Sequence, residues 1–393
     1  MSGQNLLTHC AKIGLSIFLL GLVVTCVLVV HLESSNTQVV NVLKESLRNK
    51  LQDAASTETL EISSLTCQQL NITNYDVTTS QQHLRETLPT DLDLRIESLT
   101  SMVNLPVSDE ISQVLQEMSS AVEGHHEIIL LTATSSNHFQ KNQALLKNLH
   151  DVVFPFFPNI KLVFYDIGLT QEQKSQVERH CRCTVVSFPF YKLPRHISYL
   201  NCYAWKVMII AAHYEQAEVV VWMDSSIRVL NVTSFATMVQ RTKHRGVSQR
   251  IPNKRVPNIK VTLPQMFEMF GDSPCAHDKV PQIGAAFGMY HREDLIRHAV
   301  IRPWLGCAVN QFCICPVDPV KVIRCNSIMA ASSASGIGKC HRFDQSALTI
   351  ILTKLFRDKY FYVTVESDRF VDVDRSDFVK YFEELEEREQ QQE

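Results

Sequence analysis

The stretch Glu218-Val-Val-Val-Trp-Met-Asp-Ser-Ser-Ile-Arg-Val229 decides the fold expected for this chain. Its continuous apolar run, residues 219–222, is typical of a central strand that is buried on both faces. Asp224, Ser225 and Ser226 follow, so a carboxylate and two hydroxyl groups would lie at the carboxyl edge of a parallel sheet. Open α/β proteins bind their ligands at this edge. The alternative is a strand that ends in a polar turn, with Asp224 as the N-cap of the next segment.

Apolar runs and helical patterns alternate along much of the chain. This alternation predicts right-handed βαβ crossovers and an α/β domain with a mainly parallel sheet flanked by helices. Thr170-Gln-Glu-Gln173 resembles a capping box at the start of one of the helices. The predicted strands are 128–132, 160–165, 184–188, 219–222, 283–290 and 360–365, and the predicted helices are 137–149, 170–180, 199–214, 294–299 and 343–356.

The regular pattern ends after Arg228. Residues 243–260 contain six Lys or Arg among eighteen residues and are interrupted by Pro, which predicts a loop. This loop is either a solvated surface segment or one that closes over an anionic ligand.

Composition excludes some functions. The chain has 393 residues and a net charge of -3, which gives no electrostatic argument for binding nucleic acid or an acidic membrane surface. It contains no G-x-G-x-x-G. Ser333-Ala-Ser-Gly-Ile-Gly-Lys-Cys340 faintly resembles a phosphate loop, but it lacks the leading Gly and ends in Cys, so we interpret it as a flexible loop.

The N-terminal region predicts a membrane anchor. Residues 13–32 carry no charge, and a helix of this length reaches roughly 30 Å, enough to span a hydrocarbon core. A cleaved signal peptide is the alternative, but its apolar region is usually shorter and no small-residue cleavage site follows. Lys12 precedes the run and Glu33 follows it, so residues 1–12 are expected to be cytoplasmic. We therefore expect a single-pass type II protein.

Residues 33–125 are predicted to form a luminal stem, because they are polar, nearly free of aromatic residues and without strand-like runs. A short amphipathic helix is expected at 42–51, and the anchor or stem is the expected pairing surface for a homodimer. Asn71 and Asn231 begin N-glycosylation sequons, which a luminal location would expose to modification.

The compact domain is predicted over residues 126–370, followed by an acidic tail at 371–393.

Ten of the 12 cysteines lie beyond the predicted anchor. In an oxidising lumen this density predicts disulfides. Zinc is the alternative, but the Cys-x-Cys pairs lack the C-x₂-C spacing of structural zinc sites. With connectivity left open, the disulfide candidates are Cys181, Cys183, Cys307, Cys313, Cys315, Cys325 and Cys340.

An anchor, a stem, an α/β domain and a strand that ends in Trp222-Met-Asp-Ser-Ser226 together resemble type II membrane glycosyltransferases of the Golgi with the GT-A nucleotide-sugar fold. Ala204-Trp-Lys206 is similar to the helix beside the donor in such enzymes. Gln282-Ile-Gly-Ala-Ala-Phe-Gly-Met289 is similar to their acceptor-side strand, and His341-Arg-Phe-Asp-Gln-Ser-Ala-Leu348 to their Asp-Gln helix entry. The order of these segments, with Pro303-Trp-Leu-Gly-Cys307, also resembles an animal family known only as a domain of unknown function.

The resemblance implies transfer of a sugar from a nucleotide-sugar donor to a luminal glycan or glycoprotein acceptor. It implies catalysis by Asp344 as the base, with Gln345 orienting the sugar. The donor-binding residues that it implies are Asp224, Ser226, Trp205, Lys206 and Arg228.

One departure concerns the metal. Metal-dependent transferases of this kind carry Asp-x-Asp, whose second carboxylate usually holds manganese against the donor diphosphate. Here that position is Ser226, and a hydroxyl is a poorer ligand because it brings no charge. Asp224 is then the single metal-ligand candidate, and a manganese requirement stays open. The alternative gives Asp224 the ribose or uracil, while basic residues such as Lys206, Arg228 or Lys254 neutralise the diphosphate.

Other assignments stay open as well. Asp344 has a structural alternative as an N-cap or first-turn residue of the predicted 343–356 helix. For the whole chain, the alternative is a non-catalytic luminal binding protein on a degenerate transferase domain, which the missing second Asp favours. A cell-surface adhesion protein would show tandem β-modules, and a serine hydrolase would show G-x-S-x-G. The sequence has neither feature.

Overall fold

The computed structural model describes residues 92–101, 105–252, 255–316, 325, 338, 340–366, 370–376 and 378–391, together with Asn41 and Glu45. The predicted anchor, the sequon at Asn71 and most of the predicted stem, including its 42–51 helix apart from Glu45, lie outside the described residues. Among the helices of the described part, none combines the length and the apolar character that crossing a bilayer requires.

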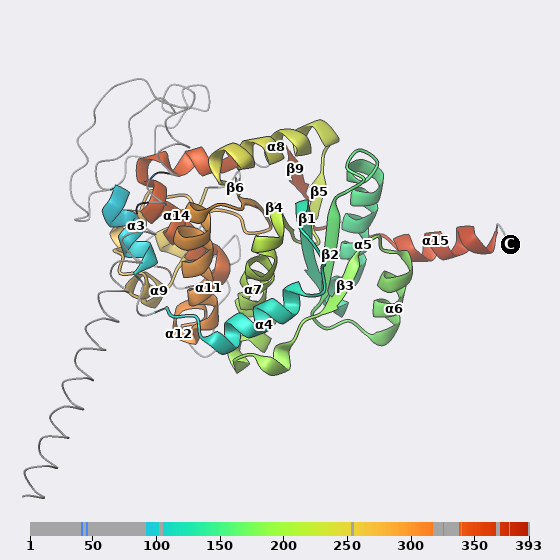
Figure 1. The fold of residues 1–393 in the computed structure, drawn as a ribbon, viewed down its shortest axis with the longest axis horizontal. Coiled ribbons are helices and arrows are strands. Elements are labelled where there is room, and N and C mark those ends of the chain that lie inside the picture. The colour runs from blue at the N-terminus through green and yellow to red at the C-terminus, as the bar shows by residue number, and fades with distance from the viewer. Residues whose placement is uncertain are drawn as a thin grey trace, which may run out of the picture.

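A seven-stranded sheet forms the centre of the molecule, in the order β3-β2-β1-β4-β7-β6-β8. Figure 1 shows β3, β2, β1 and β4 of this sheet side by side. Its strands pair in parallel except at β7, which runs antiparallel to both of its neighbours. The predicted α/β class with a mainly parallel sheet is therefore confirmed. The strands are β1 (His126–Thr134), β2 (Lys161–Asp166), β3 (Thr184–Ser187), β4 (Ala217–Met223), β6 (Val247–Ile251), β7 (Phe287–His291) and β8 (Thr364–Glu366).

Both faces of the sheet are covered, which explains the continuous apolar runs of its strands. Successive side chains of a strand point to opposite faces. In β1, Ile129 and Leu131 join one apolar core, whereas Ile128 and Leu130 join the other. Each such side chain contributes roughly 1.5–3 kcal/mol when it is fully buried.

Helices form the two outer layers. The first core lies under α3 (Leu92–Thr100), α4 (Asp109–Ser119), α7 (Ala204–His213), α11 (Arg302–Val309) and α14 (Phe343–Phe356). The second lies under α5 (Phe139–Asn148), α6 (Gln171–His180), α8 (Val232–Arg245) and α15 (Tyr381–Gln390). The short helices α9 (Pro264–Met269), α10 (Asp294–Ile296) and α12 (Gln311–Ile314) complete the described set.

Several predicted elements form close to their expected bounds, among them α5, α6 and α14. The capping box of α6 is confirmed: the Thr170 side chain accepts a hydrogen bond from the Gln173 N–H, and the Gln173 side chain accepts one from the Thr170 N–H. The 199–214 prediction is too long at its start, because 3-10 turns occupy residues 195–202 and α7 begins at Ala204.

The prediction of irregular structure after Arg228 is wrong. Asn231 is the N-cap of α8, and its side chain accepts a hydrogen bond from the Ser234 N–H at 2.8 Å. Gly246 ends this helix at a φ of +83°, a conformation that favours glycine. β6 then runs through the first half of the predicted basic loop.

Three further elements differ from their predicted bounds. β7 begins only at Phe287, and β8 only at Thr364, because a 3-10 helix, Arg357–Val363, occupies most of the predicted last strand. The predicted 294–299 helix is the start of a longer one, in which α10 passes through a π-helical turn, Arg297–Ile301, into α11.

The helices α3 and α4 fall inside the stretch that the sequence assigned to the stem. Their apolar side chains, including Ile96, Leu99 and Val114, are buried in the same core as the sheet. Gly306 of α11 lies against this segment, because a Cβ at Gly306 would come within 2.3 Å of the Leu105 carbonyl oxygen. In the described residues, the packed unit therefore begins at α3 rather than at residue 126.

The C-terminal segment is also part of the fold. β9 (Val371–Val373) pairs antiparallel with β5 (Ile227–Val229) in a second, two-stranded sheet. The acidic tail predicted at 371–393 contains α15, whose first turn buries Tyr381 and Phe382. The rest of α15 extends away from the body of the protein (Figure 1).

All seven cysteines predicted to form disulfides are bonded. The pairs are Cys181–Cys183, Cys202–Cys315, Cys307–Cys313 and Cys325–Cys340. Cys202 is the partner of Cys315 that the sequence prediction left out, and Cys275, also absent from the prediction, is disulfide-bonded as well.

Candidate functional site

Asp224 lies where the strand order of the sheet reverses. From β1 the chain continues to β2 and β3 on one side, and β4 then returns to the other side of β1. At such a point the loops after neighbouring parallel strands diverge, and open α/β sheets bind ligands there. Asp224 directly follows β4, and its N–H donates to the Ala286 carbonyl at 2.8 Å. Its side chain is 32% exposed.

Two carboxylates converge on one lysine beside this strand end. Lys206, in the first turn of α7, places its Nζ 3.1 Å from Asp224 Oδ1 and 3.3 Å from Asp344 Oδ2. The same Nζ donates to the Ala285 carbonyl at 3.2 Å. Burial by itself would lower the pKa of Lys206, but the two carboxylates outweigh it and raise the pKa above its ordinary value. Lys206 is therefore charged at neutral pH.

Asp344 is the buried member of this cluster, with a side chain only 4% exposed. Burial raises the pKa of its carboxyl to about 6, with Asp224 adding to the rise and Lys206 opposing it. Asp344 lies in the first turn of α14, as the structural alternative from the sequence predicted. Its contact with Lys206 also makes it part of the charged cluster.

Tryptophan side chains hold the Asp224 carboxylate and the backbone of Asp344 in position. Trp222 Nε1 donates to Asp224 Oδ1 at 2.7 Å, and Trp304 Nε1 donates to the Asp344 carbonyl at 3.0 Å. Trp205, predicted to bind the donor, is buried; its Nε1 donates to the Leu200 carbonyl, and its ring packs edge-on against Trp222. In this arrangement Trp205 supports the cluster from inside the core.

Left-handed backbone precedes both charged helix starts. Tyr203, at a φ of 55°, leads into α7, and Phe343, at a φ of 45°, directly precedes Asp344. Such conformations cost a bulky L-residue on the order of 1–3 kcal/mol and persist where the surrounding structure enforces them, often at functional sites. The two rings lie 6.0 Å apart, and the Tyr203 ring also lies 5.1 Å from Lys206 Nζ. The strained turns thus pack together over the lysine.

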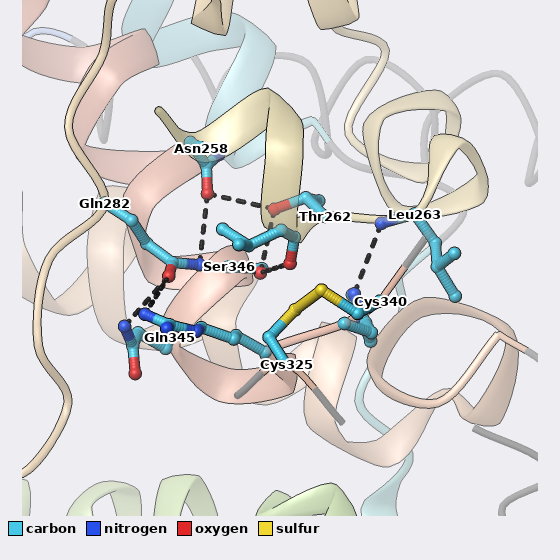
Figure 2. The surroundings of a disulfide bond; sticks show 11 residues. Asn258, Thr262, Leu263, Gln282, Cys325, Cys340, Gln345 and Ser346 are labelled. Atoms are coloured by element: carbon cyan, nitrogen blue, oxygen red, sulfur yellow. Dashed lines mark hydrogen bonds between the residues drawn. A yellow bond between two sulfur atoms is a disulfide. The ribbon is translucent and has the colours of Figure 1, made fainter. Parts of the chain in front are cut away.

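Gln345 belongs to a separate polar network (Figure 2). Its Nε2 donates to Gln282 Oε1 at 2.9 Å, and Arg342 Nη1 donates to the same oxygen at 3.1 Å. Gln282 Nε2 in turn donates to Ser346 Oγ and Asn258 Oδ1. Figure 2 shows this network beside the Cys325–Cys340 disulfide. The network fixes the start of α14, and with it the position of Asp344.

Ser226 and Arg228 shape the turn after β4. The Ser226 carbonyl accepts a hydrogen bond from the Asp374 N–H at 2.9 Å, which joins this turn to the end of β9. Arg228 Nη1 donates to the Ser225 and Ile227 carbonyls. Both residues thus support the backbone around Asp224, although the sequence assigned them to the donor.

These residues do not fit a divalent metal ion. Asp224 Oδ1 already receives the Trp222 N–H and faces the Lys206 ammonium group. A metal bound to either oxygen of this carboxylate, at about 2.0–2.6 Å, would lie within several ångströms of this positive charge. Ser226 offers a neutral hydroxyl in place of a second carboxylate. The manganese considered from the sequence therefore has no suitable set of ligands among the described residues at Asp224.

The sequence analysis missed the contributions of Tyr203, Phe343, Trp304 and the Ala285 carbonyl. Backbone carbonyls carry no sequence signal, and left-handed backbone is expected at Gly, Asn or Asp rather than at Tyr or Phe. Trp304 could have been proposed, since it lies in the quoted Pro303-Trp-Leu-Gly-Cys307 segment.

Comparisons with known proteins give one family and several structures. A family described as "Protein of unknown function (DUF1647)" matches residues 85–211. This match includes α3 and α4, in agreement with their packing into the domain. No curated protein matches the chain.

Three of the similar solved structures are, by their names, a galactosyltransferase, a xylosyltransferase and a mannan synthase. A complex of the galactosyltransferase LgtC with donor and acceptor sugar analogues is 13% identical, covering 61% of this chain and 73% of that one at a TM-score of 0.31. Mouse xyloside xylosyltransferase 1 is 9% identical, covering 65% and 100% at a TM-score of 0.38. Core-mannan synthase A from Aspergillus fumigatus, in an Mn/GDP form, is 8% identical, covering 67% and 81% at 0.37. Likenesses this weak do not assign an activity.

Proposed function

We propose that this chain is a glycosyltransferase that passes a sugar from a nucleotide-sugar donor to a glycan or glycoprotein acceptor. The observation that supports this proposal is the meeting of Asp224 and Asp344 at Lys206, beside the point where the strand order reverses. The proposal includes the location predicted from residues 13–32, a type II membrane protein of the Golgi or another secretory-pathway membrane with its acceptor in the lumen.

Asp224 is the proposed donor-binding residue. Its Oδ1 is held by Trp222 and Lys206, while its Oδ2 makes no hydrogen bond within the described residues. A carboxylate oxygen accepts strong hydrogen bonds from the hydroxyl groups of a ribose or a sugar. A carboxylate fixed in this way would orient the donor without reorganising, which is a main contribution of an enzyme to group transfer.

We propose a positioning role for Asp344. A general base must come within about 2.6–3.2 Å of the proton that it removes, whereas Asp344 is buried and faces Lys206. Holding Lys206, which in turn holds Asp224, is the role that this geometry favours. The sequence-based assignments of Asp344 as the base and of Gln345 as a sugar-orienting residue stay predictions.

The test is a thermal-shift screen of nucleotide-sugars on the full-length protein, followed by assays of sugar transfer and donor hydrolysis. We expect one donor to raise the melting temperature by mass action. Asp224→Asn should weaken its binding about 10- to 100-fold, because a hydrogen bond to a charged group contributes roughly 1.5–3 kcal/mol. Asp151→Asn, at an exposed ion pair with Lys147, is the control. A screen in which no donor binds and none is hydrolysed would contradict the proposal.

A non-catalytic luminal binding protein is the second candidate. The burial of Asp344 favours it, because the described cluster then offers one accessible carboxylate, Asp224. This candidate predicts that a donor binds through Asp224 but is neither hydrolysed nor transferred.

A further inference from the structure

We propose that Lys206 is the resident cation of this site and takes the place of a divalent metal ion, so that ligands bind at Asp224 without metal. The inference rests on the proposed function, which makes Asp224 the donor-binding residue. It goes further by stating the cofactor requirement of the site. The argument depends on how the ammonium group is surrounded, how far it is buried, and what it does to the two carboxylates.

The ammonium group of Lys206 is surrounded by oxygen. Three oxygens lie within 3.3 Å of Nζ: Asp224 Oδ1 and Asp344 Oδ2 as ion pairs, and the Ala285 carbonyl as a hydrogen-bond acceptor. These oxygens come from three separate segments of the chain, as the ligands of a bound cation commonly do. The rings of Tyr203 and Trp222 lie 5.1 and 5.4 Å from the same nitrogen. Aromatic faces stabilise a cation at such distances.

The lysine is enclosed rather than mobile. Its side chain is only 3% exposed. A lysine that reached out to an incoming phosphate would need to leave both carboxylates, one of which, Asp344, is itself buried. Leaving a buried carboxylate without a partner is strongly unfavourable. Lys206 therefore stays with the carboxylates, in contrast to the diphosphate contact considered from the sequence.

Two neighbouring carboxylates need a positive charge between them, because like charges at short range raise the pKa of one of the pair. Lys206 supplies this charge permanently, 3.1 Å from Asp224 Oδ1, so a metal bound at either oxygen of Asp224 would face its repulsion. The single accessible carboxylate is left to accept hydrogen bonds from neutral hydroxyl groups. This chemistry agrees with the sequence, in which Ser226 stands at the position where metal-dependent transferases carry a second acidic ligand.

The experiment measures Mn²⁺ binding to the full-length protein by electron paramagnetic resonance, without nucleotide-sugar. The wild type is expected to hold no Mn²⁺ that depends on Asp224. Lys206→Met removes the charge but keeps an apolar stem, and it is expected to bind one Mn²⁺ at least tenfold more tightly than the wild type. Lys206→Arg keeps the charge and should not gain this site, and Lys206→Met combined with Asp344→Asn should lose it again.

Two results would overturn the inference. One is an Mn²⁺ ion on the wild type that Asp224→Asn removes, and this measurement decides even if Lys206→Met fails to fold. The other is a folded Lys206→Met variant that gains no Mn²⁺ site. Because no donor is present, these results are independent of the nucleotide-sugar screen. If that screen finds a donor, its binding should be unchanged by EDTA.

Discussion

The ionised carboxylate of Asp344 is destabilised by its buried position in the charged cluster. Its charged form is penalised by burial, which raises its pKa from 3.8 to about 6 in the folded protein. Because the folded pKa lies above the unfolded one, the folded state binds the proton more tightly. The resulting contribution to stability is full below pH 3.8 and is lost as the pH rises through 6. A shift of this size corresponds to roughly 3 kcal/mol.

This linkage predicts how Asp344→Asn behaves with pH. Asparagine resembles the protonated carboxyl and does not titrate, so the melting temperature of the variant relative to wild type should rise between pH 4 and pH 7. Thermal denaturation across this range measures the difference. Asp372→Asn, at an exposed position on β9, is the control. A flat difference for Asp344→Asn would show that the folded state does not raise the pKa of Asp344.

The helix α3 shows what the sequence could not predict about the domain boundary. Ile96 of α3 is fully buried, whereas Leu94, two residues earlier, is 68% exposed. Such a short helix has too few apolar positions to stand out from a polar stretch, and its stability comes from tertiary packing. The boundary was therefore predicted at the first strong strand, β1.

Substitutions on α3 test whether it is part of the domain. Ile96→Ala should lower the free energy of unfolding by about 2–5 kcal/mol, because it leaves a cavity in the core. Leu94→Ala on the same helix should change it by less than about 0.5 kcal/mol. Chemical denaturation of both variants provides the comparison, and equal effects would mean that α3 does not pack as described.

The success of sequence prediction differed between the elements and the site. Strands β1, β2 and β4 could be predicted because each is a continuous apolar run between polar segments. Helix α8 could also have been recognised, since Asn231 and Gly246 are ordinary start and stop signals. The contact between Lys206 and Asp344 could not be predicted from the sequence. It joins residues far apart in the chain and depends on two turns with left-handed backbone.

The disulfides connect the molecule over very different chain lengths. Cys202–Cys315 joins the start of α7 to the segment after α12 across 113 residues, whereas Cys181–Cys183 spans only 2. A crosslink restricts the unfolded chain more when its loop is longer, by about 4–5 kcal/mol for a loop of roughly 100 residues. Cys202–Cys315 should therefore contribute more to the stability of the domain than Cys181–Cys183.

Removing each pair of cysteines tests this expectation. Cys202→Ala with Cys315→Ala should lower the free energy of unfolding by about 4–5 kcal/mol, and Cys181→Ala with Cys183→Ala by about 1–2 kcal/mol. Denaturant titrations of the two double variants under oxidising conditions give both values. A larger loss for the short pair would contradict the assignment.

The chain contains three tryptophans, and all of them lie around the charged cluster: Trp222 and Trp304 bond to Asp224 and Asp344, and Trp205 packs on Trp222. The intrinsic tryptophan fluorescence of this protein therefore originates from one neighbourhood. A molecule that reaches Asp224 would alter the emission of Trp222 directly, without a background signal from indoles elsewhere. The protein thus carries its own optical probe of occupancy, and no label needs to be attached.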